Sequence, residues 1–128
     1  MNDCLKILKA AREAEFEIQA ELEHIERLHK ILRLPSRSAE YAARMAEKLA
    51  VLERQLNECV DNACDRKREA LVCLSALTGN ERTVLYRYYI LGEDWRKISD
   101  AMYMSERCVF NIRKRALDKL NYPTGFSA

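Results

Sequence analysis

The sequence predicts an all-α protein, and three observations carry this prediction. Only three glycines and two prolines occur in 128 residues, too few for the turns of a β-rich or loop-rich fold. Alanine, leucine, glutamate, lysine and arginine, which favour helices most strongly, dominate the composition. Apolar residues also recur at steps of three and four along most of the chain, which is the period of one helix face.

The first predicted helix runs from Asn2 to Leu34. Charged residues flank its apolar seam, and Glu15 interrupts that seam. The seam comprises Leu8, Ala11, Ile18, Leu22, Ile25, His29 and Leu32. Pro35 ends the helix because it lacks a backbone donor and restricts the residue before it, and Ser38 is suited to cap a second helix.

The second predicted helix runs from about Ala39 to Leu77 without a glycine or proline. A change of phase is predicted within its seam, and the polar stretch 65–69 is expected to be exposed, bent or broken. The seam comprises Ala42, Met45, Leu49, Leu52 and Leu56, and then Val60, Cys64, Leu71 and Leu74. Such a helix is roughly 60 Å long, too long to be buried in a domain of this size. We therefore expect residues 1–77 to form a coiled-coil or oligomerisation arm with a break near 35–38. Its second helix pairs with the first as an antiparallel hairpin, with another copy of the chain, or with both.

Three shorter helices are predicted over residues 78–121. Gly79 suits the end of the preceding helix and Asn80 the start of the next. The three amphipathic units are "ERTVLYRYYIL", "WRKISDAM" and "SERCVFNIRKRALDKL", and Asp94 and Ser105 are placed to cap the second and third. Residues 122–128 contain a proline and a glycine and are predicted to be a flexible tail.

The last two units have the apolar spacing of two helices that cross steeply over a short turn. The residues with this spacing are Ile98, Met102, Met104, Val109 and Ile112. If Val109 and Ile112 face inward, the opposite side of the last helix is exposed. Its candidate base-reading residues are Ser105, Glu106, Arg107, Cys108, Phe110, Asn111 and Lys114. The candidate phosphate contacts are Arg96, Lys97, Arg113, Arg115 and Lys119.

Charge is concentrated in the same region. The whole chain has a net charge of only +2, but residues 105–121 hold five basic and two acidic residues, an excess of three positive charges. Such a basic end on a near-neutral chain is typical of a protein with one surface for a polyanion. A solvated cationic face on a helical bundle is the plainer alternative. We expect the aromatic residues Tyr86, Tyr88, Tyr89 and Trp95 to pack in the core and rim of the helical unit rather than to stack on bases.

The remaining sequence does not indicate an enzyme, a cofactor or a metal site. The five cysteines lack zinc-binding spacing, and His24 and His29 have no nearby ligand partners. No nucleophile motif, paired carboxylates or glycine-rich phosphate loop occurs. With no signal peptide and no long apolar run, we expect a cytoplasmic protein with reduced cysteines and no membrane association.

Residues 77–120, "LTGNERTVLYRYYILGEDWRKISDAMYMSERCVFNIRKRALDKL", resemble region four of bacterial sigma factors. That region is a helix-turn-helix that reads the −35 promoter element. The resemblance rests on "ERTVL", the aromatic "RYYILG", the capped "DWRKI", the serine that starts the last helix, and "RALDKL". Tyr103 departs from the pattern because the turn of this motif usually holds glycine. The long helical half followed by this unit is similar to short phage transcription regulators of the RinA and ArpU type.

The resemblance implies a phage or prophage transcription regulator that binds double-stranded promoter DNA. RNA polymerase is a further partner that it implies, and homodimerisation through the long helices fits the same layout. The alternative from another class is a coiled-coil interaction module that docks on RNA polymerase or a regulator without reading bases. The length of the coiled half supports this alternative, as do Glu106 and Asp118, which dilute the positive face.

Overall fold

A computed structural model describes residues 4–34 and 38–121, and every regular element in these ranges is a helix, as the composition predicts. The elements are α1 (Cys4–Arg33), α2 (Ala39–Leu74), α3 (Gly79–Leu85), η1 (Tyr86–Ile90), α4 (Trp95–Met102) and α5 (Glu106–Asn121). Element η1 is a π-helical turn that continues α3. The predicted start at Asn2, the break at Pro35 and the tail at 122–128 lie outside the described residues.

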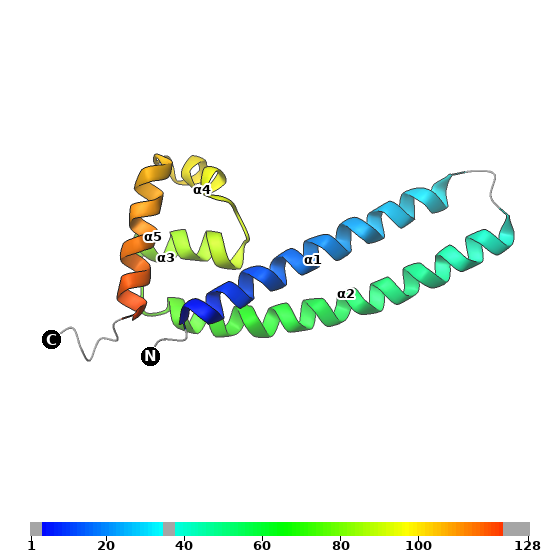
Figure 1. The fold of residues 1–128 in the computed structure, drawn as a ribbon, viewed down its shortest axis with the longest axis horizontal. Helices are drawn as coiled ribbons and strands as arrows, with labels where there is room; N and C mark the ends of the chain where they lie inside the picture. Colours follow the sequence, from blue (N-terminus) through cyan, green and yellow to red (C-terminus); the bar gives the residue numbers. More distant parts are fainter. Residues whose placement is uncertain (1–3, 35–37, 122–128) are drawn as a thin grey trace.

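Helices α1 and α2 lie side by side in opposite directions and form a long arm (Figure 1). Helix α2 has 36 residues, so the arm is about 54 Å long. Ser38 caps α2 as predicted, since its Oγ accepts a hydrogen bond from the Tyr41 N–H at 3.1 Å. Helices α3, α4 and α5 gather at the end of the arm where α1 begins and α2 ends (Figure 1).

The predicted phase change in the seam of α2 is wrong. Val60, Cys64 and Leu71 are exposed, whereas Ala63 and Ala70 are buried. The helix continues unbroken through the polar stretch 65–69, so the steps of three and four persist and small alanines occupy the contact with α1.

Individual seam residues also differ from the prediction. Leu22 and Ala42 are exposed, while Ala14 is buried. Glu15, the polar interruption in α1, pairs with Lys67 from the polar stretch of α2. The two irregularities in the sequence are therefore the two halves of one ion pair between the helices.

The junction between the long and short helices also differs in detail. Helix α2 ends at Leu74 rather than Leu77, with Ser75 as its C-cap. The residue before α3 is Thr78, so Asn80 lies in the first turn and is not the predicted N-cap. Gly79 has a φ of 59°, a left-handed conformation that glycine adopts at little cost, and this allows the chain to turn there.

One hydrophobic core joins the arm to the short helices. Leu8 of α1, Leu74 of α2, Leu85 of α3 and Leu120 of α5 all belong to it, and Tyr89 of η1 lies among them. These five residues are at most 8% exposed. The sequence-predicted boundary between residues 77 and 78 therefore separates residues that share a single core.

Tyr103 is in a left-handed conformation, with φ 55° and ψ 44°, and its side chain is 95% exposed. A Cβ atom in this conformation costs about 1–2 kcal/mol, and the exposed ring offers little packing in return. We expect Tyr103→Gly to raise the free energy of unfolding by up to about 1 kcal/mol, because the greater freedom of glycine in the unfolded chain offsets part of the relief. Chemical denaturation measures this change. Tyr103→Ala is the control, since it removes the ring but keeps the Cβ, and an equal gain for both variants would contradict the explanation by backbone strain.

Candidate nucleic-acid interface

Helices α4 and α5 are joined by three residues and pack through a small core of their own. Ile98 of α4 contacts Val109 and Ile112 of α5, and Val84 of α3 completes the cluster. Met102 and Met104 pack against its edge. The structure thus brings together all five apolar residues whose spacing suggested two crossing helices.

Both predicted caps of these helices form. The Asp94 Oδ1 atom accepts a hydrogen bond from the Lys97 N–H at 2.8 Å, and the Ser105 Oγ atom accepts one from the Cys108 N–H at 3.1 Å. Each cap satisfies an amide that the first turn of a helix leaves without a partner. The caps and the core together fix where α4 and α5 begin and which way each helix is rotated.

The seven candidate base-reading residues are all exposed. Arg107, Asn111 and Lys114 follow one another at steps of four and three, so they form a single stripe on α5 opposite its buried side. We call these three residues the reading stripe. Phe110, which is 51% exposed, borders the stripe on the side that faces Trp95.

The other candidates lie at the edges of this surface. Cys108 is on the flank of α5 near Met104, with 3.8 Å between the two sulfur atoms. Ser105 is exposed but uses its hydroxyl in the cap, and Glu106 follows it in the first turn. The stripe therefore presents two cations and one amide, with donors and acceptors suited to base edges and phosphates.

The five candidate phosphate contacts do not lie together. Arg96 and Lys97 are exposed in the first turn of α4. Arg115 and Lys119 lie on the flank of α5 that faces α3, where Lys119 Nζ is 2.8 Å from one Glu81 carboxylate oxygen and Arg115 Nε is 3.8 Å from the other.

Arg113 lies on the opposite flank of α5 and is half-buried. Its guanidinium carbon is 5.4 Å from the centre of the Trp95 ring and 5.6 Å from that of Phe110. Its Nη2 atom is 3.5 Å from the Tyr89 hydroxyl oxygen. The side chain is therefore directed towards η1 and α1 rather than along the reading stripe.

The aromatic residues pack in the core and rim of the unit, as the sequence analysis expects. Tyr88 stacks on Trp95 with 3.9 Å between ring centres and 9° between planes. Tyr89 is buried and meets Tyr88 edge-on. Phe110 in turn approaches Trp95 edge-on, so a row of rings connects η1 to the border of the reading stripe.

Arg12 of α1 is a residue that the sequence analysis missed. Its Nη1 atom donates hydrogen bonds to the carbonyl oxygens of Tyr88 and, at 3.1 Å, of Glu93, and its guanidinium lies 3.7 Å from the centre of the Tyr88 ring. Carbonyls at a helix end have no partner within the helix, so Arg12 satisfies part of the end of η1. It is separated from Tyr88 by 76 positions, and no local pattern could have linked them.

Gly92 brings the loop after η1 close to α1. Its φ is 75°, and a Cβ at this position would lie 3.0 Å from the Glu15 side chain. The close approach places the loop within reach of Arg12. Through these contacts the arm supports the segment that leads into α4.

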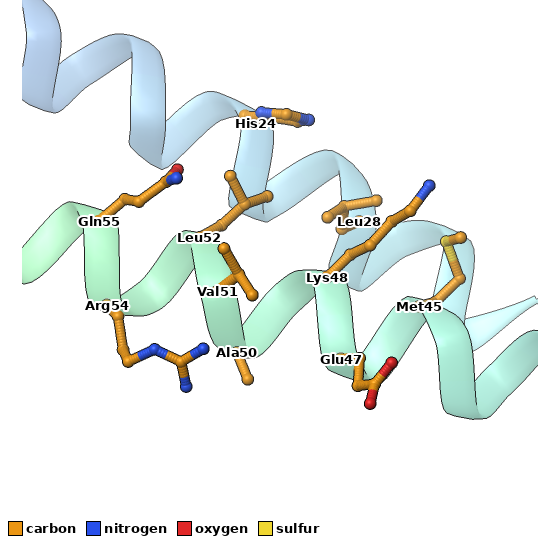
Figure 2. Close-up of a pocket in the computed structure, with 10 residues that line it drawn as sticks. All are labelled: His24, Leu28, Met45, Glu47, Lys48, Ala50, Val51, Leu52, Arg54 and Gln55. Atoms are coloured by element: carbon orange, nitrogen blue, oxygen red, sulfur yellow. The ribbon is translucent and has the colours of Figure 1, made fainter.

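A separate open groove of about 730 Å³ runs along the far part of the arm (Figure 2). Leu28 of α1 and Leu52 of α2 point into the space between the helices, whereas Glu47, Ala50 and Arg54 point away from α1 (Figure 2). The groove is remote from α4 and α5. In the described ranges 4–34 and 38–121, no three histidine, cysteine or acidic side chains gather as a metal site would require.

The five cysteines are free thiols. Burial, together with a side-chain hydrogen bond that the Cys73 thiol donates to Cys4, raises the pKa of Cys73 to about 12. Burial, and then the charge of Glu21, raises the pKa of Cys59 above its ordinary value. Both thiols therefore stay protonated at neutral pH, and the protonated thiol is neither the nucleophilic nor the metal-binding form of cysteine.

Comparison with family models, curated proteins and solved structures gave no match to this chain. None of the helices in the described part of the chain combines the length and apolarity needed to cross a bilayer.

Proposed function

We propose that the protein is a sequence-specific DNA-binding transcription regulator of phage or prophage origin. In this proposal α4, the turn at residues 103–105 and α5 act as a helix-turn-helix, and α5 enters the major groove of promoter DNA. One observation carries the proposal. Arg107, Asn111 and Lys114 are exposed together on one stripe of a helix whose opposite side is locked in a core.

The chemistry of the stripe supports base reading. Arginine can donate two hydrogen bonds to the O6 and N7 atoms of guanine, and asparagine can pair with the N6 and N7 atoms of adenine. We assign these roles to Arg107 and Asn111. Phe110 and Cys108, on the two flanks, are placed to contact a thymine methyl group. Ser105, Glu106 and Lys114 complete the base-facing surface.

The positive side chains around the stripe support phosphate binding. Arg96 and Lys97 are exposed at the start of α4, the helix that crosses the DNA backbone in this motif. Arg115 and Lys119 share Glu81 in ion pairs that leave their side chains 65% and 63% exposed. Ion pairs this exposed are weak and exchange readily, so both residues remain candidate phosphate contacts.

Selection of binding sites from a random pool of duplex DNA, read out by sequencing, tests the proposal. We expect a defined consensus whose core spans the few base pairs that one recognition helix can read. A two-fold symmetric consensus would support homodimers paired through the arms, and a single half-site would support a monomer that acts with RNA polymerase. If the selection enriched no sequence, even at low salt, the proposal would be overturned.

The arm favours a second candidate function, docking on a protein partner such as RNA polymerase without reading bases. Its long helices carry exposed apolar side chains, among them Leu22 (49% exposed) and Val72 (69% exposed), which an interface could bury. A polymerase pulldown that succeeds while the random-pool selection fails would favour this candidate.

A further inference from the structure

A small pocket lies where α1 meets η1 and α5. Its volume is about 250 Å³, below the roughly 300–1,000 Å³ of sites that enclose a drug-sized molecule. The lining residues are Lys9, Arg12, Glu13, Phe16, Tyr88, Tyr89 and Arg113. The first four are spaced so that they share one face of α1. We call this space the junction pocket.

Positive charge in the junction pocket is not balanced. Lys9, Arg12 and Arg113 face a single carboxylate, that of Glu13. Arg12 is hydrogen-bonded to two backbone carbonyls, and Arg113 to the Tyr89 hydroxyl. Within the described residues, neither guanidinium forms an ion pair with a carboxylate.

The hydrogen bonds of Arg113 are incomplete as well. Its Nε atom is buried and has no acceptor among the described residues. A donor of a charged group that is buried without an acceptor costs free energy. Like charges gathered in a partly buried space add to this cost.

Two rings of the pocket lie against the Arg12 guanidinium. Arg12 stacks on Tyr88 and also lies 4.6 Å from the centre of the Phe16 ring. A guanidinium stacked by its face keeps its N–H groups in one plane, and this planar fork matches the oxygen geometry of phosphate. The pocket thus combines excess positive charge, guanidinium groups and space for a small anion.

We propose that Lys9, Arg12 and Arg113 form a binding site for one phosphate group, so that the arm provides two of its three cations. Arg113 directly precedes Lys114 of the reading stripe, so a DNA strand at the edge of the groove occupied by α5 would run past the pocket. The phosphate group could come from the DNA backbone, and this version of the proposal rests on the proposed function. It could also be free inorganic phosphate, which does not depend on that function.

Thermal unfolding tests whether the junction pocket binds free inorganic phosphate. We expect inorganic phosphate to raise the Tm of the wild-type protein above its value in chloride of equal ionic strength, because a ligand that binds only the folded state stabilises it. Lys9→Gln, a change at an exposed position, should remove most of this rise. Lys30→Gln is the matched control on the same helix, roughly 30 Å away, and should keep the rise. Equal rises in wild-type and Lys9→Gln would overturn the proposal.

Binding of duplex DNA at several salt concentrations tests whether the junction pocket contacts a phosphate of the DNA backbone. The logarithm of the association constant falls linearly with the logarithm of the salt concentration. If Lys9 helps to neutralise one phosphate, this slope should be less steep by about 0.9 in Lys9→Gln and unchanged in Lys30→Gln. Duplex binding with equal slopes, together with no phosphate-specific rise in Tm, would remove the site and leave the proposed function standing. A phosphate-specific rise that Lys9→Gln abolishes, in a protein that binds no duplex, would keep the site and remove the proposed function.

Discussion

Alanine at Arg107 or Asn111 is expected to lower affinity for the selected DNA site by roughly 10- to 100-fold, the loss of a bidentate base contact worth about 1–3 kcal/mol. The loss should be confined to the preferred sequence. Each variant should also relax the preference at one base pair, since the lost contact distinguishes that pair from the others. A fluorescence-based titration with the selected duplex and with single-base variants measures both effects.

The controls separate base reading from general attraction to DNA. Arg96→Ala removes an exposed cation from α4 and should weaken all sequences about equally, with a salt slope smaller by about 0.9. Arg27→Ala, an exposed change on the arm, should alter neither affinity nor slope. All four side chains are exposed, so the Tm of each variant should stay near that of the wild type. If Arg107→Ala and Asn111→Ala both kept the full sequence preference, the assigned reading stripe would be wrong.

The phase of α5 could be predicted from sequence because its causes are local. Five apolar residues at fixed spacing and two capping residues, Asp94 and Ser105, determine how α4 and α5 begin and rotate. The caps of α2 and α4 act within three residues, and so does that of α5. Tyr103 follows the same logic, since a short turn between two helices requires a left-handed residue whatever its type.

The flanks of α5 could not be predicted because they depend on helices distant in sequence. The helical period places Arg113 on one flank and Arg115 and Lys119 on the other. It does not show that the first faces Trp95 and Phe110, or that the other two face Glu81. The predicted seam of α2 was wrong for a related reason. Which face of a long helix is buried depends on the close approach of α1, and that approach selected Ala63 and Ala70 over larger neighbours.

The contact between the arm and the short helices leads to the largest expected effect on stability. Leu8 is fully buried at the start of α1, in the core that it shares with α2, α3, η1 and α5. Leu8→Ala should lower the free energy of unfolding by about 2–5 kcal/mol, the usual cost of such a cavity. Leu22→Ala is the matched control on the same helix and should cost less, because that side chain is 49% exposed.

Two probes can show whether that loss is shared by the whole molecule. Trp95, the single tryptophan, reports on the short helices through its fluorescence, while far-ultraviolet ellipticity is dominated by the 30 residues of α1 and the 36 of α2. Because one core joins the two parts, we expect both signals to change in one coincident transition, and Leu8→Ala to shift both equally. An arm that melts earlier while Trp95 keeps the wild-type midpoint would mean that the two parts fold independently. The arm could not then hold Lys9 and Arg12 in a fixed position beside Arg113.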